Sequence, residues 1–271
     1  MHTFDNFPPV PLTLEGAGIL HQMLRVRWPE WRKLTAIRRD EIVKQASNSL
    51  KSMEQAGSAA FSLLGHKGDL MLIHFRPDFD ALDQVQRCMV RLDLWDYLEQ
   101  TTSYISVVEL GLYESTAKVY TTLAEKGAEP HTAQWDAEIK DTLERQRQAM
   151  HPRLFPEVPP HKYLCFYPMD RRRGEVKNWY QLPMAERQRQ MAEHGAVGRR
   201  YAGTVKQIIS GSIGFDDWEW GVDLFADDPL VFKRLIYEMR FDEVSAVFAQ
   251  FGSFYIGQRV QAADLGSYLS L

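Results

Sequence analysis

The chain has 271 residues, of which 45% are hydrophobic and 12% aromatic, and its formal net charge at pH 7 is −4. A chain of this size can bury a hydrophobic core and fits one large domain or two of ordinary size. The pI near 6.1 argues against a general affinity for nucleic acid, which requires a basic surface. Cys88 and Cys165 are too few for a disulfide framework.

The opening residues, MHTFDNFPPVPLTLEG, contain neither the basic block nor the apolar block of an export signal. Nowhere in the chain do enough apolar residues follow one another to predict a membrane-spanning helix. We therefore expect a cytoplasmic protein with no nucleic-acid or membrane partner.

Two segments, residues 69–111 and 220–257, share one order of features. Each contains an apolar strand, an acidic turn with proline, an amphipathic helix and a final strand. A strand and a helix precede each segment in matching order. Each half therefore predicts the β-α-β-β-α-β order of a ferredoxin-like unit, and the two together predict an α+β barrel with helices outside.

The repeat divides the chain into three expected regions. Residues 1–111 form the N-terminal ferredoxin-like half, residues 112–160 a helical linker, and residues 161–271 the C-terminal half that carries the functional site. The linker is polar and ends in the proline-rich HPRLFPEVPPH. It is either a solvated connector or a segment whose last residues fold over a pocket.

The stretch AEHGAVGRRYAG, residues 192–203, places His194 at the predicted end of a helix that begins near Pro183. Met184, Met191 and His194 share one face, which we expect to be buried. Gly195 is a natural residue to end a helix, and the helix dipole favours a histidine there. His194 therefore has a structural explanation as well as a functional one.

Two predicted strands place polar groups among apolar neighbours. The strand expected at 201–209 buries Gln207, and the strand YLCFYPM sets Tyr167 and Met169 on one face. Such an amide or phenol either finds a hydrogen-bond partner in the core or is directed at a ligand. The arginines at 171–173 and 199–200 lie in solvated turns or bind a carboxylate or phosphate.

Five stretches resemble the chlorite-dismutase-like haem proteins, and in particular their coproheme decarboxylase branch. They are YPMDRRR, NWYQLP, HGAVGRRYAG, GSIGFDDWEWGVDLF and YEMRFDEVSA. The resemblance is dense over 160–257 and looser over 15–111. It implies that His194 is the proximal ligand of a porphyrin iron. It also implies that Gln207 lies on the distal side, where members that decompose chlorite carry arginine.

Further site residues follow from the same resemblance. Tyr167 matches the tyrosine that is oxidised to a radical and takes hydrogen from a propionate, and Met169 is its neighbour. At position 171 the family commonly has lysine after a small residue, whereas this chain has Arg171 after Asp170. Trp179, Trp218 and Trp220 are expected to pack around the pocket. The implied propionate-binding residues are Arg153, Arg171, Arg240 and Ser245.

The resemblance implies an enzyme of haem biosynthesis. Its reaction is the peroxide-dependent oxidative decarboxylation of two propionates of iron-coproporphyrin III (coproheme) to vinyl groups, which gives haem b. A homopentamer and a transient contact with ferrochelatase are expected on the same ground. Three alternatives stay open: a chlorite dismutase that forms chloride and dioxygen, a non-catalytic haem carrier, and an α+β barrel protein without haem.

Overall fold

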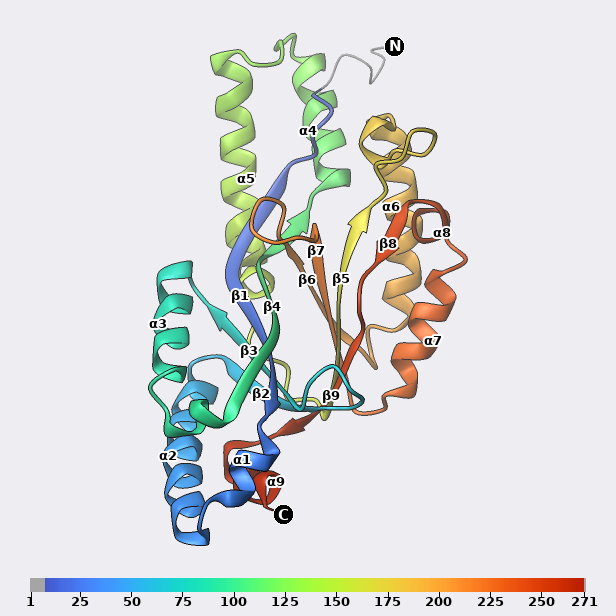
Figure 1. The fold of residues 1–271 in the computed structure, drawn as a ribbon. Coiled ribbons are helices and arrows are strands. Elements are labelled where there is room, and N and C mark those ends of the chain that lie inside the picture. Colours follow the sequence, from blue (N-terminus) through green and yellow to red (C-terminus); the bar gives the residue numbers. More distant parts are fainter. Residues whose placement is uncertain (1–7, 271) are drawn as a thin grey trace.

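The computed structural model describes residues 8–270 (Figure 1). In the first part of the chain, strands and helices follow one another in the predicted order, with a short 3-10 helix at Asp93–Tyr97. These elements are β1 (Thr13–Val26), α1 (Trp28–Lys33), α2 (Ala36–Gln55), β2 (Ser58–Leu63), β3 (Leu70–Arg76), α3 (Phe79–Met89) and β4 (Leu98–Gly111). Two helices come next, α4 (Tyr113–Glu125) and α5 (Ala133–Leu154).

The last part of the chain repeats the order strand, helix, strand, strand, helix, with further short elements after it. The elements are β5 (Tyr163–Arg171), α6 (Met184–Arg200), β6 (Lys206–Gly211), β7 (Trp220–Ala226), α7 (Leu230–Met239), α8 (Glu243–Phe248), β8 (Ala249–Phe251), β9 (Tyr255–Val260) and α9 (Leu265–Leu269). Short 3-10 helices occur at Trp179–Gln181 and Ala262–Asp264.

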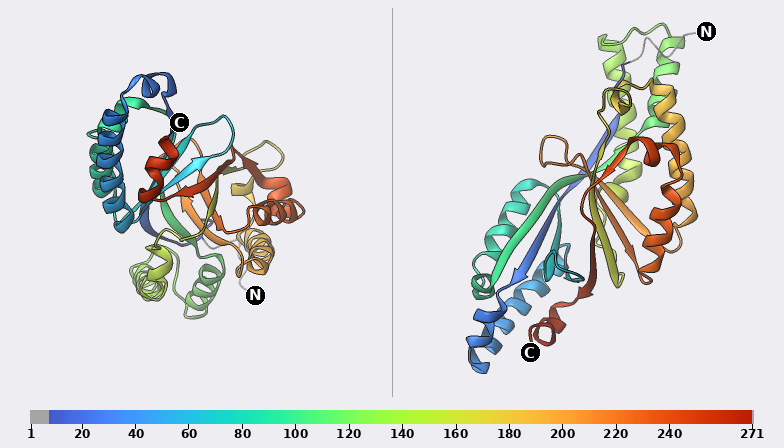
Figure 2. Two further views of the ribbon diagram at one scale, coloured as in Figure 1. Left: turned by 90° about the horizontal axis from the view of Figure 1, so that it is seen from below. Right: turned by 45° about the vertical axis from the view of Figure 1, so that its right-hand side comes forward.

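Within residues 8–270, the strands β1 to β9 belong to one nine-stranded sheet with the order β7-β6-β4-β1-β3-β2-β9-β5-β8. Because β7 also pairs with β5, the sheet closes on itself. The first and last parts of the chain are joined by the pairs β4–β6 and β2–β9. Figure 2 shows the helices outside this barrel. The predicted α+β barrel is confirmed.

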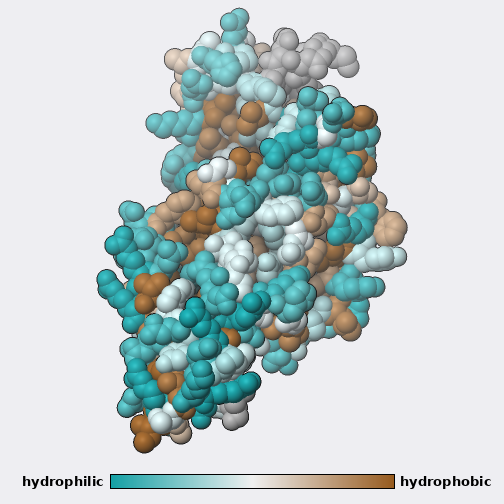
Figure 3. Space-filling view, in the orientation of Figure 1, coloured by the Kyte–Doolittle hydropathy of each residue, from teal (hydrophilic) through white to brown (hydrophobic). Residues whose placement is uncertain are grey.

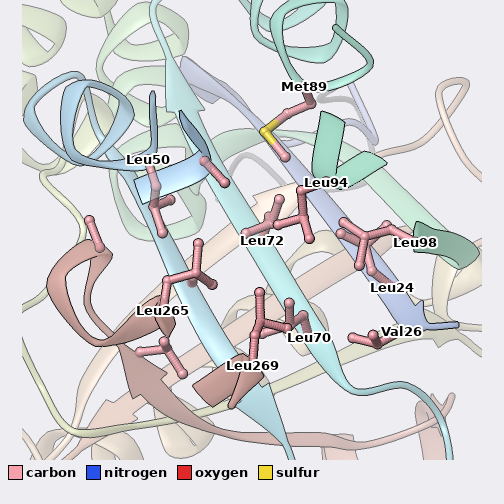
Figure 4. Close-up of a cluster of buried hydrophobic side chains, with 14 of the residues drawn as sticks. Leu24, Val26, Leu50, Leu70, Leu72, Met89, Leu94, Leu98, Leu265 and Leu269 are labelled. Carbon is pink, nitrogen blue, oxygen red and sulfur yellow. The ribbon is translucent and has the colours of Figure 1, made fainter. Parts of the chain in front are cut away.

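Side chains of the strands alternate between the barrel interior and the outer faces. The interior is filled by one apolar cluster that includes Ile19, Phe61, Phe166 and Phe225. A second cluster lies between the outer face of the first strands and the helices α2 and α9 (Figure 4). A third cluster lies outside β5, β6 and β7, under α6 and α7. The functional residues predicted from the sequence, except Arg153 on α5, lie in or around this third cluster.

One polar contact crosses the barrel interior. Nε2 of His21 on β1 lies 2.9 Å from Oδ1 of Asp223 on β7, and both residues are fully buried. The imidazole also stacks on Phe166 of β5, with 3.9 Å between ring centroids. This contact connects strands from opposite parts of the chain and fixes their relative placement.

The structure corrects the predicted end of the histidine-bearing helix. α6 continues through Gly195 and Gly198 to Arg200, and β6 begins only at Lys206 rather than at 201. Each internal glycine costs a helix about 1 kcal/mol. The last turn of α6 packs against α7, since Val197 and Tyr201 join the outer cluster and the Tyr201 hydroxyl donates to Glu238 at 2.7 Å.

The surface seen in Figure 3 is mostly hydrophilic, and its hydrophobic patches are small and separate. Among residues 8–270, no helix combines the length and apolar character needed to cross a bilayer.

We expect Asp223→Ala to lower the free energy of unfolding by about 3–5 kcal/mol, because it leaves buried His21 without its partner. Urea denaturation followed by circular dichroism measures this loss. The double variant His21→Leu/Asp223→Leu removes both polar groups and should lose less. A loss below about 1 kcal/mol for Asp223→Ala would show that the contact contributes little.

Candidate functional site

The outer face of β5 forms the floor of the candidate site. Tyr163, Cys165, Tyr167 and Met169 all belong to the outer cluster, whereas Leu164 and Phe166 belong to the barrel interior. This is the alternation predicted from the sequence. Helix α6 supplies His194 to the same region, and the segment from Arg240 through α8 supplies the remaining predicted groups.

His194 is held by two residues at the start of α8. Its Nδ1 lies 2.9 Å from Oδ2 of Asp242 and 3.4 Å from Oγ of Ser245. Its Nε2 has no hydrogen-bond partner among residues 8–270. Metal-binding histidines commonly donate their second ring N–H to a carboxylate, which fixes the tautomer and orients the ring. The side chain is 23% exposed, so Nε2 is available to an iron atom.

Asp242 serves both the histidine and the helix that follows. Its Oδ1 accepts from the backbone N–H of Ser245 at 2.7 Å and thereby caps α8. Burial disfavours the charged carboxylate, but the hydrogen bonds with His194 and Ser245 outweigh burial, so the pKa of Asp242 lies below its ordinary value. Asp242 was not predicted from the sequence. An aspartate three residues before Ser245 is an N-cap pattern, and this pattern indicates a residue at the start of a helix.

Tyr167 is buried, with 4% of its surface exposed. Its ring stacks on Phe254 at 4.5 Å and contacts Phe251 at 5.7 Å between centroids. Burial, followed by the neighbouring Cys165, raises the pKa of the phenol. No hydrogen bond from its hydroxyl is formed within the described residues, so the site holds a neutral phenol that can act on a ligand.

Arg171 has an aromatic environment. Its guanidinium lies 5.0 Å from the Trp179 ring centroid and 6.0 Å from that of Trp220, and Nη2 donates to the Met191 sulfur at 3.6 Å. Burial lowers its pKa. In residues 8–270 no carboxylate pairs with this guanidinium, because Glu219 accepts instead from the Arg171 backbone N–H at 2.8 Å.

The sequence departure at Asp170 does not disturb Arg171. The Asp170 carboxylate accepts from the backbone N–H of Glu219 at 2.8 Å. Burial raises the pKa of Tyr104, a residue of the barrel interior, and the charge of Asp170 adds to this effect. Neighbouring residues of a strand point to opposite faces. The two side chains are therefore on opposite sides of β5.

The remaining predicted residues fall into two groups. Arg240 lies with its guanidinium 3.7 Å from the Phe251 ring centroid, Ser245 is 5% exposed beside His194, and Met169 is 9% exposed. These three join the cluster around Tyr167 and His194. Arg153 differs, since it is exposed in the last turn of α5, next to Leu154, which packs with Leu14 of β1. No contact within the described residues connects Arg153 with the cluster.

Gln207 requires a correction. The predicted strand pattern buries its amide, but the residue is exposed at the start of β6. A Cβ at Gly198 of α6 would lie 3.7 Å from its Oε1. The exposed amide therefore lies beside α6, and within residues 8–270 it makes no hydrogen bond that would keep it from a ligand.

The donor set suits iron inside a macrocycle better than a bare ion. The described part of the chain contains no group of three or more His, Cys, Asp or Glu side chains that could hold a metal ion. One histidine with a free Nε2 can supply an axial bond when a porphyrin supplies the other four nitrogen ligands. The unpaired guanidiniums of Arg171 and Arg240 could bind carboxylates at its edge.

Comparison with known proteins agrees with this arrangement. The sequence profile described as "Chlorite dismutase" matches residues 39–260. The chain belongs to the chlorite dismutase family. A family member from Staphylococcus saprophyticus named coproheme decarboxylase is 41% identical over 270 residues, which cover 97% of this chain and 100% of that protein.

Two further relatives carry names that refer to haem binding. One from Haloquadratum walsbyi is 43% identical over 96% of this chain, but the chain spans only 47% of the length of that relative. The solved structure of a haem-binding protein from Thermus thermophilus has a TM-score of 0.83 and 35% identity, and the match covers 98% of this chain and 100% of that one.

We expect Asp242→Ala to lower the free energy of unfolding by about 2 kcal/mol, since both a helix cap and the His194 contact are lost. The matched control is Asp78→Ala, which removes the cap of α3 and should cost about 1 kcal/mol. Urea denaturation compares the two. Equal losses would mean that the contact between Asp242 and His194 adds nothing to stability.

Proposed function

We propose that this protein converts iron-coproporphyrin III to haem b, using hydrogen peroxide to decarboxylate two propionates to vinyl groups. The near full-length likeness to a coproheme decarboxylase supports this proposal. The observation that carries it is the combination, around β5, of a histidine with a free Nε2, a buried phenol and two guanidiniums without carboxylate partners.

The decarboxylation of each propionate consumes one hydrogen peroxide. The bond between the propionate chain and its carboxyl carbon breaks, one hydrogen leaves the adjacent β-carbon, and carbon dioxide and a vinyl group form. The two electrons released reduce one hydrogen peroxide to two waters. The bound iron porphyrin supplies the redox chemistry, and the protein supplies placement and electrostatics.

The residues of this chain then have distinct roles in the proposal. His194 binds the iron through Nε2, while Asp242 fixes the orientation of the ring. Tyr167 loses an electron and its phenolic proton and, as a radical, takes hydrogen from the propionate β-carbon. Met169 lies beside it. Gln207 would orient a bound ligand through hydrogen bonds rather than transfer protons, because an amide is no acid-base catalyst. Arg171, Arg240 and Ser245 hold propionates.

Assembly and location are parts of the same proposal and rest on the family resemblance. We propose a cytoplasmic homopentamer that meets ferrochelatase transiently. Light scattering coupled to size-exclusion chromatography measures the first of these directly.

The decisive experiment adds ferric coproporphyrin III and then peroxide to the purified protein, and follows the tetrapyrrole by mass spectrometry. We expect stepwise loss of two carboxyl groups ending at haem b. Tight binding without loss of mass would favour a haem carrier, and oxygen release from chlorite would favour a chlorite dismutase.

In the same assay we expect Tyr167→Phe to bind coproheme with near wild-type affinity and to form no haem b, because phenylalanine cannot give the phenoxyl radical. Tyr163→Phe, on the same face of β5, is the matched control and should keep wild-type turnover. Haem b formation by Tyr167→Phe at the wild-type rate would refute the radical role.

A further inference from the structure

A buried arginine lies on the face of α6 that carries His194. Arg187 precedes His194 by seven residues, which is two turns, so the two residues share a face about 10 Å apart along the helix axis. Arg187 is 4% exposed. Its Nη2 donates to the carbonyl of Pro9, and its Nε has no hydrogen-bond partner. No ion pair of Arg187 is formed within residues 8–270.

Tyr113, the first residue of α4, joins Arg187 to Arg171. Its ring packs in the apolar cluster that contains Trp179, on which the Arg171 guanidinium lies, and Met191, to which Arg171 donates. Burial raises the pKa of the phenol, while the positive charges of Arg187 and Arg171 and a hydrogen bond with Trp179 oppose this. Arg187 precedes Met191 by four residues on α6, so its side chain lies beside the same cluster. Figure 2 shows α4 beside α6.

The carboxylates that face this cluster already have partners, and Glu109, whose charge acts on the Tyr113 phenol, hydrogen-bonds with Trp220. Glu219 accepts from the backbone of Arg171 and pairs with Arg173, and Asp242 accepts from His194 and Ser245. Two guanidiniums withdrawn from water without a counter-ion are costly, since nothing in the described chain replaces the lost hydration. An anionic group from a ligand would supply the missing partner.

We infer that Arg187 and Tyr113, together with Arg171, bind one propionate of the porphyrin. This inference rests on the proposed function and names one of its carboxylate subsites. If His194 holds the iron, Arg187 lies two turns away on the same face of α6, and its guanidinium would be available to a carboxylate of the porphyrin. The subsite supplies a cation that exposed Arg153 on α5 does not. Tyr113 belongs to the start of the linker at 112–160, so the start of the linker, rather than its last residues, contacts the ligand in this inference.

The test measures porphyrin dissociation constants by Soret titration with ferric coproporphyrin III, and by fluorescence with metal-free coproporphyrin III, which removes the contribution of His194. We expect Arg187→Met to raise both constants about 10- to 100-fold, as for loss of a charged hydrogen bond. Tyr113→Phe should raise them about 3- to 10-fold. The control is Arg189→Met, which removes an exposed arginine of the same helix that pairs with glutamates, and should change them less than about twofold.

Thermal unfolding of the ligand-free protein separates ligand binding from a structural role. Removing a buried cation without a counter-ion should leave the Tm of Arg187→Met unchanged or raise it. A fall in Tm with unchanged dissociation constants would overturn the inference. Should Arg187→Met not fold, Arg187→Lys keeps the charge without the planar fork, and unchanged binding by Arg187→Lys and Tyr113→Phe would also overturn it.

The two proposals fail in different ways. If the wild-type protein forms haem b while Arg187→Met binds coproheme as tightly as the wild type, only the subsite is wrong. If the wild-type protein binds no coproheme, the proposed function is wrong and the subsite with it.

Discussion

The register of β5 is the constraint on which the rest of the structure depends. β5 pairs with β7 to close the barrel and with β8 and β9 on its other side. Phe166 points into the barrel and stacks on His21, while Tyr167 points outward into the candidate site. A slip of one residue would exchange these faces. The contact between His21 and Asp223 opposes such a slip, because it connects strands across the interior.

The candidate site combines satisfied and unsatisfied polar groups. His194, Asp242 and Ser245 form a connected set that fixes one imidazole nitrogen and leaves the other free. Arg187 is buried and Arg171 lies against tryptophan rings, and neither has a carboxylate partner in the described chain. Such unsatisfied cations lower stability. They are expected where a protein is arranged to receive an anion that is part of its ligand.

The features that could be predicted from the sequence are those that follow from the periodicity of its apolar residues and from its repeat. Alternation placed Tyr167 and Met169 on one face of β5, and the repeated order of elements predicted the barrel. Prediction from the sequence was wrong where packing between distant segments overrides a local sequence pattern. Gly195 was predicted to end the helix, yet α6 continues to Arg200, where Val197 and Tyr201 pack against the outer cluster.

Arg187 was missed for a different reason. It lies in phase with His194 on the helix period, so its face could be predicted from spacing alone. The absence of a counter-ion for Arg187 could not be predicted, because it depends on where Tyr113, Glu219 and Asp242 lie in the folded chain. Ion pairing between distant segments is a property of the folded chain, and a single sequence does not report it.

The two outer faces of the barrel differ in what covers them. On the first strands, Leu24, Leu70 and Leu72 are buried beneath α2 and α9, and the Trp31 indole donates to the Leu269 carbonyl at 3.0 Å. The opposite face keeps an exposed amide at β6 and glycines in the helix above it. A fold built from a repeat could in principle hold two equivalent ligands. Under the proposed function, the helices that bury the first face predict a stoichiometry of one macrocycle per chain.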